Sequence, residues 1–336
     1  MKINKTELQK ALEIVKPGLA NKEIIEQSTS FAFINGNVTT YNDEISISHP
    51  LTGLKLTGAV KAEELYKLLS KTKGDEIEME IKDNEIHFTS GKGKAGLTLQ
   101  AEIKLPLEEI ADKEDWQELP DGFAKDVLFV AQACSNDMSR PVLTCVHINP
   151  EGHIESSDGF RIIRLEKQIG VEESILIPAT AAVEVAKLKP INISLSKGWA
   201  HFQSEEGTVL SCRVFDDKYP AVGKLLNVEG IELLLPKAIL EIIERAAVFA
   251  KRDHFLDEEI QVKIENKKIQ IRGESDTGWY EEETNIRYTG DPVVFAITPY
   301  LFQEILKVTQ TCILGTNHIK FTGDGWQYVA ILRNAE

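Results

Sequence analysis

The stretch Ile175–Val214, ILIPATAAVEVAKLKPINISLSKGWAHFQSEEGTVLSCRV, decides how the rest of the sequence is interpreted. It begins with an apolar strand that ends at Pro178, and a proline is well suited to open a helix because its missing N–H would have no partner there. The apolar spacing then predicts a helix over 179–188. Three short runs with strand character follow, at 191–196, 199–204 and 208–214. The stretch therefore predicts a strand, a helix and a three-stranded antiparallel meander.

The same strand-to-helix junction recurs six times along the chain. The junctions are centred on Ile3, Val60, Leu119, Ile177, Leu235 and Ile297, in steps of 57, 59, 58, 58 and 62 residues. A fixed period indicates repeated structural units, and six modules of this length fill the chain. Half of the strands of each module must find partners in a neighbouring module. Taken in pairs, the modules predict an α+β protein with three tandem domains, at 1–113, 114–226 and 227–336.

The composition is typical of a soluble globular protein, with 42% hydrophobic and 27% charged residues. The N-terminal residues include no apolar segment of a secretory signal, and no apolar run is long enough to cross a bilayer. The four cysteines, Cys134, Cys145, Cys212 and Cys312, are scattered and form no CxxC pair. We therefore expect reduced thiols and a cytoplasmic location.

No catalytic motif is present in the sequence. The seven histidines are spread over the modules, and no HExxH, GxSxG or Walker sequence occurs. The segment 91–96, GKGKAG, matches GxGxxG, but strand-like residues follow it where a dinucleotide site needs a helix. We interpret this segment as a turn. The sequence predicts a protein that is not an enzyme and has no catalytic residues, cofactor or metal.

The charge distribution points to one protected basic surface. A net charge of −15 argues against nucleic-acid binding over the outer surface, although basic residues on one internal face would still allow it. Basic residues occur on or beside every module helix: Lys10, Lys16, Lys67, Lys71, Lys125, Lys187, Lys189, Lys237, Arg245 and Lys307. Each alone is an ordinary exposed helix residue. Their recurrence on all six modules predicts a shared basic surface built from helices.

Three segments resemble the bacterial-type DNA polymerase sliding clamp, the DNA polymerase III beta subunit. Ser156–Ile162, SSDGFRI, resembles the (A/S)TDGHRL segment of that family, and Val214–Pro220, VFDDKYP, resembles its VDGRFPDY segment. Arg245–Phe249 resembles a helix end of the same family, and the similarity covers essentially the whole chain. The resemblance implies a head-to-tail homodimeric ring, with sheets outside and helices lining a central pore for duplex DNA. Such a ring is a processivity factor that tethers the replicative polymerase without catalysing a reaction.

The resemblance also implies two sets of functional residues. The positions that would face DNA in the pore, without sequence preference, are Lys10, Lys22, Arg140, Lys187, Lys224 and Arg245. A pocket between the second and third domains would take short peptides of the polymerase and the clamp loader. Its walls would be Leu143, Ser157, Gly159, Phe160, Arg161, Ile162, Pro220, Leu225, Val329 and Ile331. Phe160 stands where the family usually has histidine, and the end of the chain, ILRNAE from Ile331, departs from the usual tail.

The ring interface implied by the resemblance joins the edge strand 92–101 of the first domain to the third domain of a second copy. Its residues would be Lys92, Lys94, Leu97 and Leu99 on one side and Val248, Phe249, Glu281, Glu282 and Glu283 on the other. Opposite charges across this seam would favour the head-to-tail orientation. Two alternatives stay open. One is a clamp-fold tether in repair or checkpoint work, and the other is a β-rich scaffold protein with no DNA partner.

Overall fold

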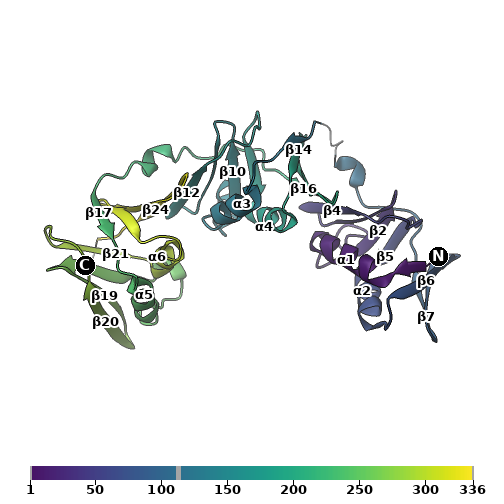
Figure 1. Ribbon diagram of the computed structural model, residues 1–336, viewed down its shortest axis with the longest axis horizontal. Coiled ribbons are helices and arrows are strands. Elements are labelled where there is room, and N and C mark those ends of the chain that lie inside the picture. The colour runs from purple at the N-terminus through teal and green to yellow at the C-terminus, as the bar shows by residue number, and fades with distance from the viewer. Residues whose placement is uncertain (1, 111–114, 335–336) are drawn as a thin grey trace. The chain divides into compact units, whose positions relative to one another are not determined.

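The computed structural model of the chain describes residues 2–110 and 115–334, and in these residues the predicted repeat is present (Figure 1). Each α-helix is preceded by one strand and followed by three. The helices are α1 (Lys5–Val15), α2 (Ala62–Lys71), α3 (Phe123–Ala131), α4 (Ala179–Leu188), α5 (Ile239–Ala247) and α6 (Pro299–Leu306). The strands that precede them are β1 (Lys2–Asn4), β5 (Gly58–Lys61), β9 (Gln117–Glu118), β13 (Ile175–Pro178), β17 (Ile231–Leu234) and β21 (Val293–Ile297).

Every helix is followed by a three-stranded meander, as the stretch 175–214 predicts. The first three meanders are β2 (Ser30–Ile34), β3 (Asn37–Tyr41) and β4 (Ile45–Pro50); β6 (Glu76–Lys82), β7 (Glu85–Ser90) and β8 (Gly93–Thr98); β10 (Cys145–Asn149), β11 (His153–Ser157) and β12 (Arg161–Glu166). The other three are β14 (Asn192–Ser196), β15 (Trp199–Gln203) and β16 (Val209–Arg213); β18 (Ile260–Glu265), β19 (Lys268–Ser275) and β20 (Gly278–Asn285); β22 (Thr311–Leu314), β23 (His318–Thr322) and β24 (Trp326–Ile331). The α+β prediction is confirmed.

Local capping accounts for several helix boundaries. The Asn4 side chain accepts hydrogen bonds from the backbone N–H groups of Thr6 and Glu7 and caps α1. Pro178 occupies the N-cap position of α4. Thr298 occupies the N-cap position of α6, but its side chain forms no capping hydrogen bond, so Pro299 alone marks that helix start. In the segment 91–96, Gly91 and Lys92 form a turn, whereas residues 93–96 already belong to strand β8. The turn interpretation therefore holds for the first two residues, and a strand stands where a dinucleotide site needs a helix.

The strand before each helix pairs with the meander of a different module. Strand β1 of the first module pairs with β6 of the second, while β5 of the second module pairs with β2 of the first. The same exchange joins β9 to β14, β17 to β22 and β21 to β18. The prediction that modules share strands is therefore confirmed, and a single module cannot complete its own sheet.

The chain divides into two compact units, which comprise residues 1–129 with 175–216 and residues 130–174 with 217–336. The predicted second domain, 114–226, is thus distributed over both units. Strand β4 of the first module pairs with β16 of the fourth, which explains why these modules belong to one unit. Strand β12 of the third module pairs with β24 of the sixth, which places these modules in the other unit. The predicted boundary between residues 113 and 114 lies outside the described residues, and the three-domain division stays a prediction.

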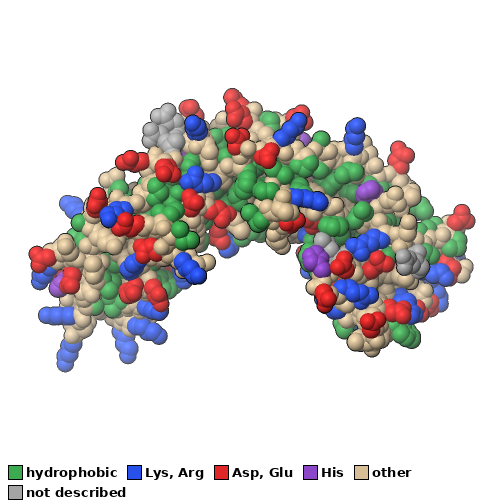
Figure 2. All heavy atoms as spheres, turned by 180° about the vertical axis from the view of Figure 1, so that it is seen from behind, with side chains coloured by type: hydrophobic (Ala, Val, Ile, Leu, Met, Phe, Trp, Pro, Cys, Tyr) green, Lys and Arg blue, Asp and Glu red, His purple; other side chains and the backbone are tan. Residues whose placement is uncertain are grey.

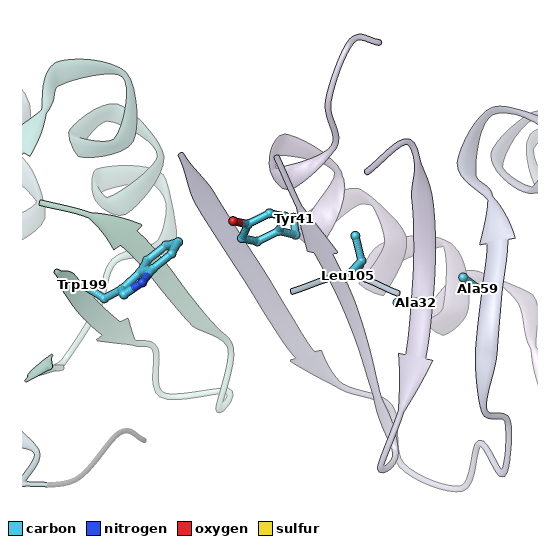
Figure 3. Close-up of a cluster of buried hydrophobic side chains, with 5 residues drawn as sticks. All are labelled: Ala32, Tyr41, Ala59, Leu105 and Trp199. Atoms are coloured by element: carbon cyan, nitrogen blue, oxygen red, sulfur yellow. The ribbon is translucent and has the colours of Figure 1, made fainter. Parts of the chain in front are cut away.

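In the first unit, an eight-stranded sheet carries a helix on one face and a linker on the other. Its strand order is β5-β2-β3-β4-β16-β15-β14-β9. The Thr40 hydroxyl donates to the Val15 carbonyl of α1, so Thr40 faces that helix. Tyr41 therefore faces the other side, where its ring lies 6.4 Å from that of Trp199 on β15 (Figure 3). Leu105, from the segment that follows β8, completes this buried cluster with Ala32 and Ala59.

In the second unit, the larger sheet has the same two faces. Its strands within this unit run β10-β11-β12-β24-β23-β22-β17, and a smaller sheet runs β20-β19-β18-β21. The Tyr328 hydroxyl donates to the Leu301 carbonyl of α6 over 2.7 Å, so Tyr328 faces that helix. Because side chains alternate along a strand, Val329 points to the opposite face. There it packs with Ile162, Val222 and Leu226, and the latter two belong to the segment between β16 and β17. A linker therefore covers the face of the sheet opposite α6.

A buried polar row crosses this linker-covered face. It consists of His147 on β10, Glu155 on β11 and Arg164 on β12, which are direct cross-strand neighbours. The His147 Nδ1 lies 2.8 Å from one Glu155 carboxylate oxygen, and the Arg164 Nη2 and Nε lie 2.6 and 2.9 Å from the other. The Ser174 Oγ lies 2.8 Å from the second ring nitrogen of His147. Every charged group in the row thus has a partner, as buried charges require.

Two pKa values in and beside this row are lowered. Burial alone would raise the pKa of Glu155, but hydrogen bonds from His147 and Arg164 outweigh it and lower the pKa. Burial, with help from the Arg164 charge, lowers the pKa of His153, whose Nε2 lies 3.5 Å from Glu155. His153 is 6% exposed. The native state therefore disfavours protonation of both side chains.

We expect the free energy of unfolding to fall as the pH is lowered through the titration range of His153. The unfolded state binds this proton near pH 6.5 while the native state resists it, so stability is full above that pH and declines below it. The slope from one group is at most about 1.4 kcal/mol per pH unit. His153→Gln should give a flatter profile between pH 7.5 and 5.5 in urea denaturation, with the loss from Glu155 at lower pH retained. Parallel profiles for the two proteins would contradict this assignment.

Candidate functional site

The apolar face under the linker between β16 and β17 contains part of the predicted peptide pocket. Ile162 and Val329 are cross-strand neighbours on β12 and β24, and both are almost fully buried. Beside them, Leu225 and Ile331 keep 48% and 38% of their surface exposed. An apolar floor with exposed apolar side chains near it can bind an apolar side chain of a partner, because such burial is favourable.

Two residues of this face are not among the predicted wall residues. Val222 and Leu226, which sit four residues apart in the linker, pack directly on Ile162 and Val329. Val222 directly precedes the short 3-10 turn Gly223–Leu226, and Leu226 is its last residue. Two apolar residues at this spacing are the signal that could have identified them. Leu143 is buried after the loop 135–141, and Pro220 is exposed in the linker.

The segment 157–161 turns the predicted wall residues away from this apolar face. Asp158 Oδ1 accepts hydrogen bonds from the backbone N–H groups of Phe160 and Arg161, at 2.9 and 3.0 Å. Gly159 has φ +90°, a conformation that glycine adopts without strain. The Ser157 hydroxyl donates to the Arg161 carbonyl and closes the turn. Arg161 then leads into β12 on the side opposite to Ile162.

Arg161 is held on the helix-facing side by a dense set of contacts. Its Nε lies 3.1 Å from Asp158 Oδ2, and its guanidinium lies 4.4 Å from the centre of the Tyr300 ring. The Tyr300 hydroxyl donates to the same carboxylate over 3.0 Å, and a further Arg161 nitrogen donates to the Gln132 carbonyl. Burial opposes the Arg161 charge, but Tyr328, Tyr300 and Asp158 outweigh it and raise the pKa. The guanidinium therefore stays charged although only 5% exposed.

These residues line a hollow with a volume of about 890 Å³, which is within the size range of ligand pockets. Its lining includes Gly159, Phe160 and Arg161 together with Arg140, His254, Phe255 and Tyr300. The Phe255 ring stands edge-on to that of Tyr300, with centres 5.4 Å apart. The structure thus distributes the predicted wall residues over two surfaces of the second unit, an apolar face under the linker and this polar and aromatic hollow.

The residues predicted to face DNA lie in different environments. Lys10 on α1 is 3.4 Å from Glu206, and Lys187 on α4 is 2.7 Å from Glu184. Lys22 is exposed in the loop before β2, and no described residue forms an ion pair with it. Arg245 on α5 is bound by Glu282, at 2.7 Å, and by the Tyr280 hydroxyl. All of these cations are more than a third exposed, so their ion pairs are weak and salt-sensitive.

Two of the predicted DNA-facing residues do not share the helix surface. Arg140 lines the hollow beside Gly159. Lys224 lies in the 3-10 turn whose Leu226 packs on Val329, on the face of the sheet opposite α6. The position of Lys224 follows from local packing. Because Leu226 of the same turn is buried against the sheet, Lys224 is exposed on the linker side.

The helices themselves are not net basic. α1 and α2 each carry two acidic and two basic residues, and α3 and α4 carry one of each. α5 carries two acidic residues and one basic, and α6 carries a single acidic residue. The predicted basic surface therefore depends on residues that flank the helices, such as Lys16, Lys22 and Lys189. Figure 2 shows acidic and basic side chains interspersed over the visible face.

The predicted interface residues lie at two sheet edges. Strand β8 is the edge of the sheet β1-β6-β7-β8, and β20 is the edge of the other four-stranded sheet. Lys92 and Lys94 are exposed, and no ion pair joins them to another residue within 2–110 or 115–334. Leu97 is partly buried, but Leu99 follows β8 and is only 5% exposed, so it belongs to the core of its own unit.

On the other edge, the predicted glutamates already have partners. Glu281 lies 3.3 Å from Arg272, Glu282 binds Arg245, and Glu283 binds Lys268. Glu281 and Glu283 share one face of β20 because side chains alternate along a strand, while Glu282 is on the face of α5. Val248 is 64% exposed just after α5, and Phe249 stacks on Tyr280 of β20 at 6.4 Å. An exposed apolar residue therefore lies close to this edge.

A hollow of about 270 Å³ lies next to the other edge, β8. It is lined by Leu68 and Leu69 of α2, by Ile77 and Phe88 of the sheet, and by Lys94 and Ala95 of β8 itself, among others.

No group of three or more histidine, cysteine, aspartate or glutamate side chains in the described residues is arranged to hold a metal ion. No helix in the described part of the chain is long and apolar enough to cross a membrane. The four cysteines form no disulfide within the described residues.

Comparisons with known proteins were made in sequence and in structure. No protein-family model matches the chain. The beta sliding clamp of Buchnera aphidicola is 23% identical over 250 residues, which cover 68% of this chain and 66% of that protein, just under two thirds of its length.

Solved sliding clamps have the same fold over the full length of the chain. The DNA polymerase III subunit beta of Pseudomonas aeruginosa, in a structure bound to griselimycin, superposes with a TM-score of 0.87 at 16% identity, covering 100% of this chain and 99% of that one. The clamp of Bacillus subtilis gives 0.84 at 16% identity, with the same coverage. The beta chain of Streptococcus pneumoniae gives 0.82 at 18% identity and covers 99% of both chains. The chain is therefore similar in sequence to a bacterial beta sliding clamp and has the fold of the solved sliding clamps, in line with the resemblance of the segments 156–162 and 214–220.

Proposed function

We propose that this chain is a DNA sliding clamp, a processivity factor that encircles duplex DNA and tethers a DNA polymerase. The observation that carries the proposal is the likeness to sliding clamps over the full length of the chain, with all six modules present. The protein would act through topology and would catalyse no reaction. Its place of action would be the cytoplasm, and its three domains would follow the boundaries predicted from the repeat.

The ring would form from two copies joined head to tail through β8 of one and β20 of the other. Each of these strands has a paired neighbour on one side only, so pairing them would satisfy exposed backbone groups and remove two sheet edges. The hollow beside β8 would receive Val248, which is otherwise an exposed apolar side chain. Lys92 and Lys94 would face Glu281 and Glu283. Because those glutamates also contact Arg272 and Lys268, the apolar contact would supply most of the affinity.

DNA would be held loosely in the pore. Weak phosphate contacts are sufficient, because a clamp must slide, and such contacts carry no sequence information. Lys22 and Lys187 are the most available of the predicted residues, one unpaired among the described residues and one in an exposed pair with Glu184. Arg245 would contribute less because Glu282 and Tyr280 already bind it.

The polymerase and the clamp loader would dock through short peptides on the linker-covered face of the second unit. Apolar side chains of the peptide would bury against Ile162, Val329, Leu225 and Ile331. Polar groups of the same partners would reach the hollow lined by Arg140 and Phe160. Griselimycin, which is bound in the Pseudomonas aeruginosa clamp structure, provides a chemical probe of binding to this chain.

The deciding experiment is topological. We expect the protein, once loaded by a purified bacterial clamp loader with ATP, to stay on nicked circular DNA through gel filtration and to leave the same DNA after linearisation. A closed ring can leave only over an end. Equal retention on both forms would favour ordinary DNA binding, and no retention on either would favour the scaffold alternative. Copurification with a replicative polymerase, or with repair proteins, would distinguish the two clamp roles.

The ring interface can be tested by truncating its apolar anchor. We expect Val248→Ala combined with Phe249→Ala to give a folded monomer in sedimentation velocity, where the unmodified protein is a dimer at micromolar concentration. Truncation of interface anchors typically costs about 2 kcal/mol or more, which weakens binding about thirtyfold. Val308→Ala, which truncates another exposed apolar residue, 53% exposed after α6, should stay dimeric. An unmodified protein that sediments as a monomer would refute the ring.

The pore can be tested through the salt dependence of DNA binding. We expect Lys22→Glu with Lys187→Glu to weaken binding of a labelled 30-base-pair duplex in fluorescence anisotropy. Because each phosphate contact releases counterions, the log–log slope of affinity against salt should become shallower by roughly two units. Lys224→Glu is the matched control, since Lys224 lies on the linker side, and it should leave the slope unchanged. A double variant with the slope of the unmodified protein would contradict the assignment.

A further inference from the structure

The linker that carries part of the proposed pocket is attached to the sheet through the buried polar row. The ring of Tyr219 stacks on that of His147, with centres 4.6 Å apart and an angle of 24° between the planes. Tyr219 is only 6% exposed although it lies in a connecting segment. Stacked aromatic pairs of this kind stabilise beyond the area that they bury. Tyr219 therefore holds the first part of the linker against β10.

Two more contacts hold the linker further along. At Gly223, a side chain would begin 3.6 Å from the Arg164 guanidinium, so the linker backbone passes close to that group. At Leu226, the backbone carbonyl accepts a hydrogen bond of 2.8 Å from the Lys320 ammonium of β23. Two exposed apolar residues of the linker, Pro220 and Leu225, each lie between two of these three contacts.

The first two contacts depend on one carboxylate. Glu155 accepts from His147 with one oxygen and from Arg164 with the other, so it fixes both the imidazole under Tyr219 and the guanidinium beside Gly223. Glu155 is 3% exposed, and a buried charge that loses a partner is costly, so the row keeps a single arrangement. The sheet thereby presents a rigid polar surface to the linker at two points.

We propose that His147, Glu155 and Arg164 are positioning residues that fix the linker so that Pro220 and Leu225 are held at the rim of the partner-binding face. None of the three would touch the partner. The inference rests on the proposed function for its consequence, which is that partner affinity depends on this row. Its structural part, attachment of the linker through Tyr219 and Gly223, is independent of that function.

The test compares Tyr219→Leu with Tyr219→Phe by hydrogen exchange of the backbone amides in residues 217–226. Leucine fills the site but cannot stack, and phenylalanine keeps the ring. We expect exchange in this segment to become about two- to tenfold faster in Tyr219→Leu, and to stay unchanged in Tyr219→Phe. The amides of β18 and β19 in the same unit are the internal reference and should not change. Equal exchange in both variants, or a rise that is as large in β18 and β19, would overturn the proposal.

Arg164→Lys provides a second variant that keeps a positive charge beside Glu155. A lysine cannot reproduce the two-nitrogen contact with the Glu155 carboxylate, so its charge would not be held in the same place beside Gly223. We expect faster exchange at residues 222–226, again with β18 and β19 unchanged. Unchanged exchange at 222–226 would show that Arg164 does not position the linker.

Binding of griselimycin by the same proteins, measured by isothermal titration calorimetry, tests the consequence. Tyr219→Leu should bind griselimycin more weakly than the unmodified protein, and Tyr219→Phe should bind as the unmodified protein does. Faster linker exchange with unchanged binding would overturn the positioning role. If the unmodified protein does not bind griselimycin while the linker responds as expected, the proposed pocket fails and the attachment of the linker stands.

Discussion

The exchange of strands between modules is the constraint on which the rest of the structure depends. A module supplies one strand, one helix and a meander, but its first strand completes the sheet of another module. Strand β1 pairs with β6, and β5 pairs with β2 in return. Three exposed strands cannot by themselves bury the apolar face that the helix offers. The modules are therefore stable only together, and the meanders then extend into larger sheets through β4 with β16 and β12 with β24.

Sheets built in this way have two differently used faces. In the first unit, Thr40 faces α1 and Tyr41 faces the segment after β8. In the second unit, Tyr328 faces α6 and Val329 faces the segment after β16. In the first unit, the face of the sheet under the linker is filled, since Tyr41, Trp199 and Leu105 are all buried. In the second unit, the corresponding face leaves Leu225 and Ile331 partly exposed. This difference gives a physical reason why a partner would bind at the second linker.

Electrostatics plays a limited part in the proposed ring. The helices carry nearly balanced charges, and most of their cations pair with a nearby glutamate, as Lys187 does with Glu184. Exposed pairs of this kind compete with phosphate contacts and weaken them. For a protein that must slide, weak and replaceable contacts are suitable. The stronger interactions are buried, in the row of His147, Glu155 and Arg164 and around Arg161.

The sequence by itself determined the repeat, the order of elements in each module and the resemblance to sliding clamps. It could do so because helix and strand patterns are local and the period of about 58 residues is regular. The helix over 179–188 is an example. Only the tertiary structure decided which face each side chain occupies. The turn at Asp158 and Gly159 directs Arg161 to the helix side, and burial of Leu226 directs Lys224 to the linker side. Such directions depend on strand register and on packing between residues far apart in the chain, which no local pattern encodes.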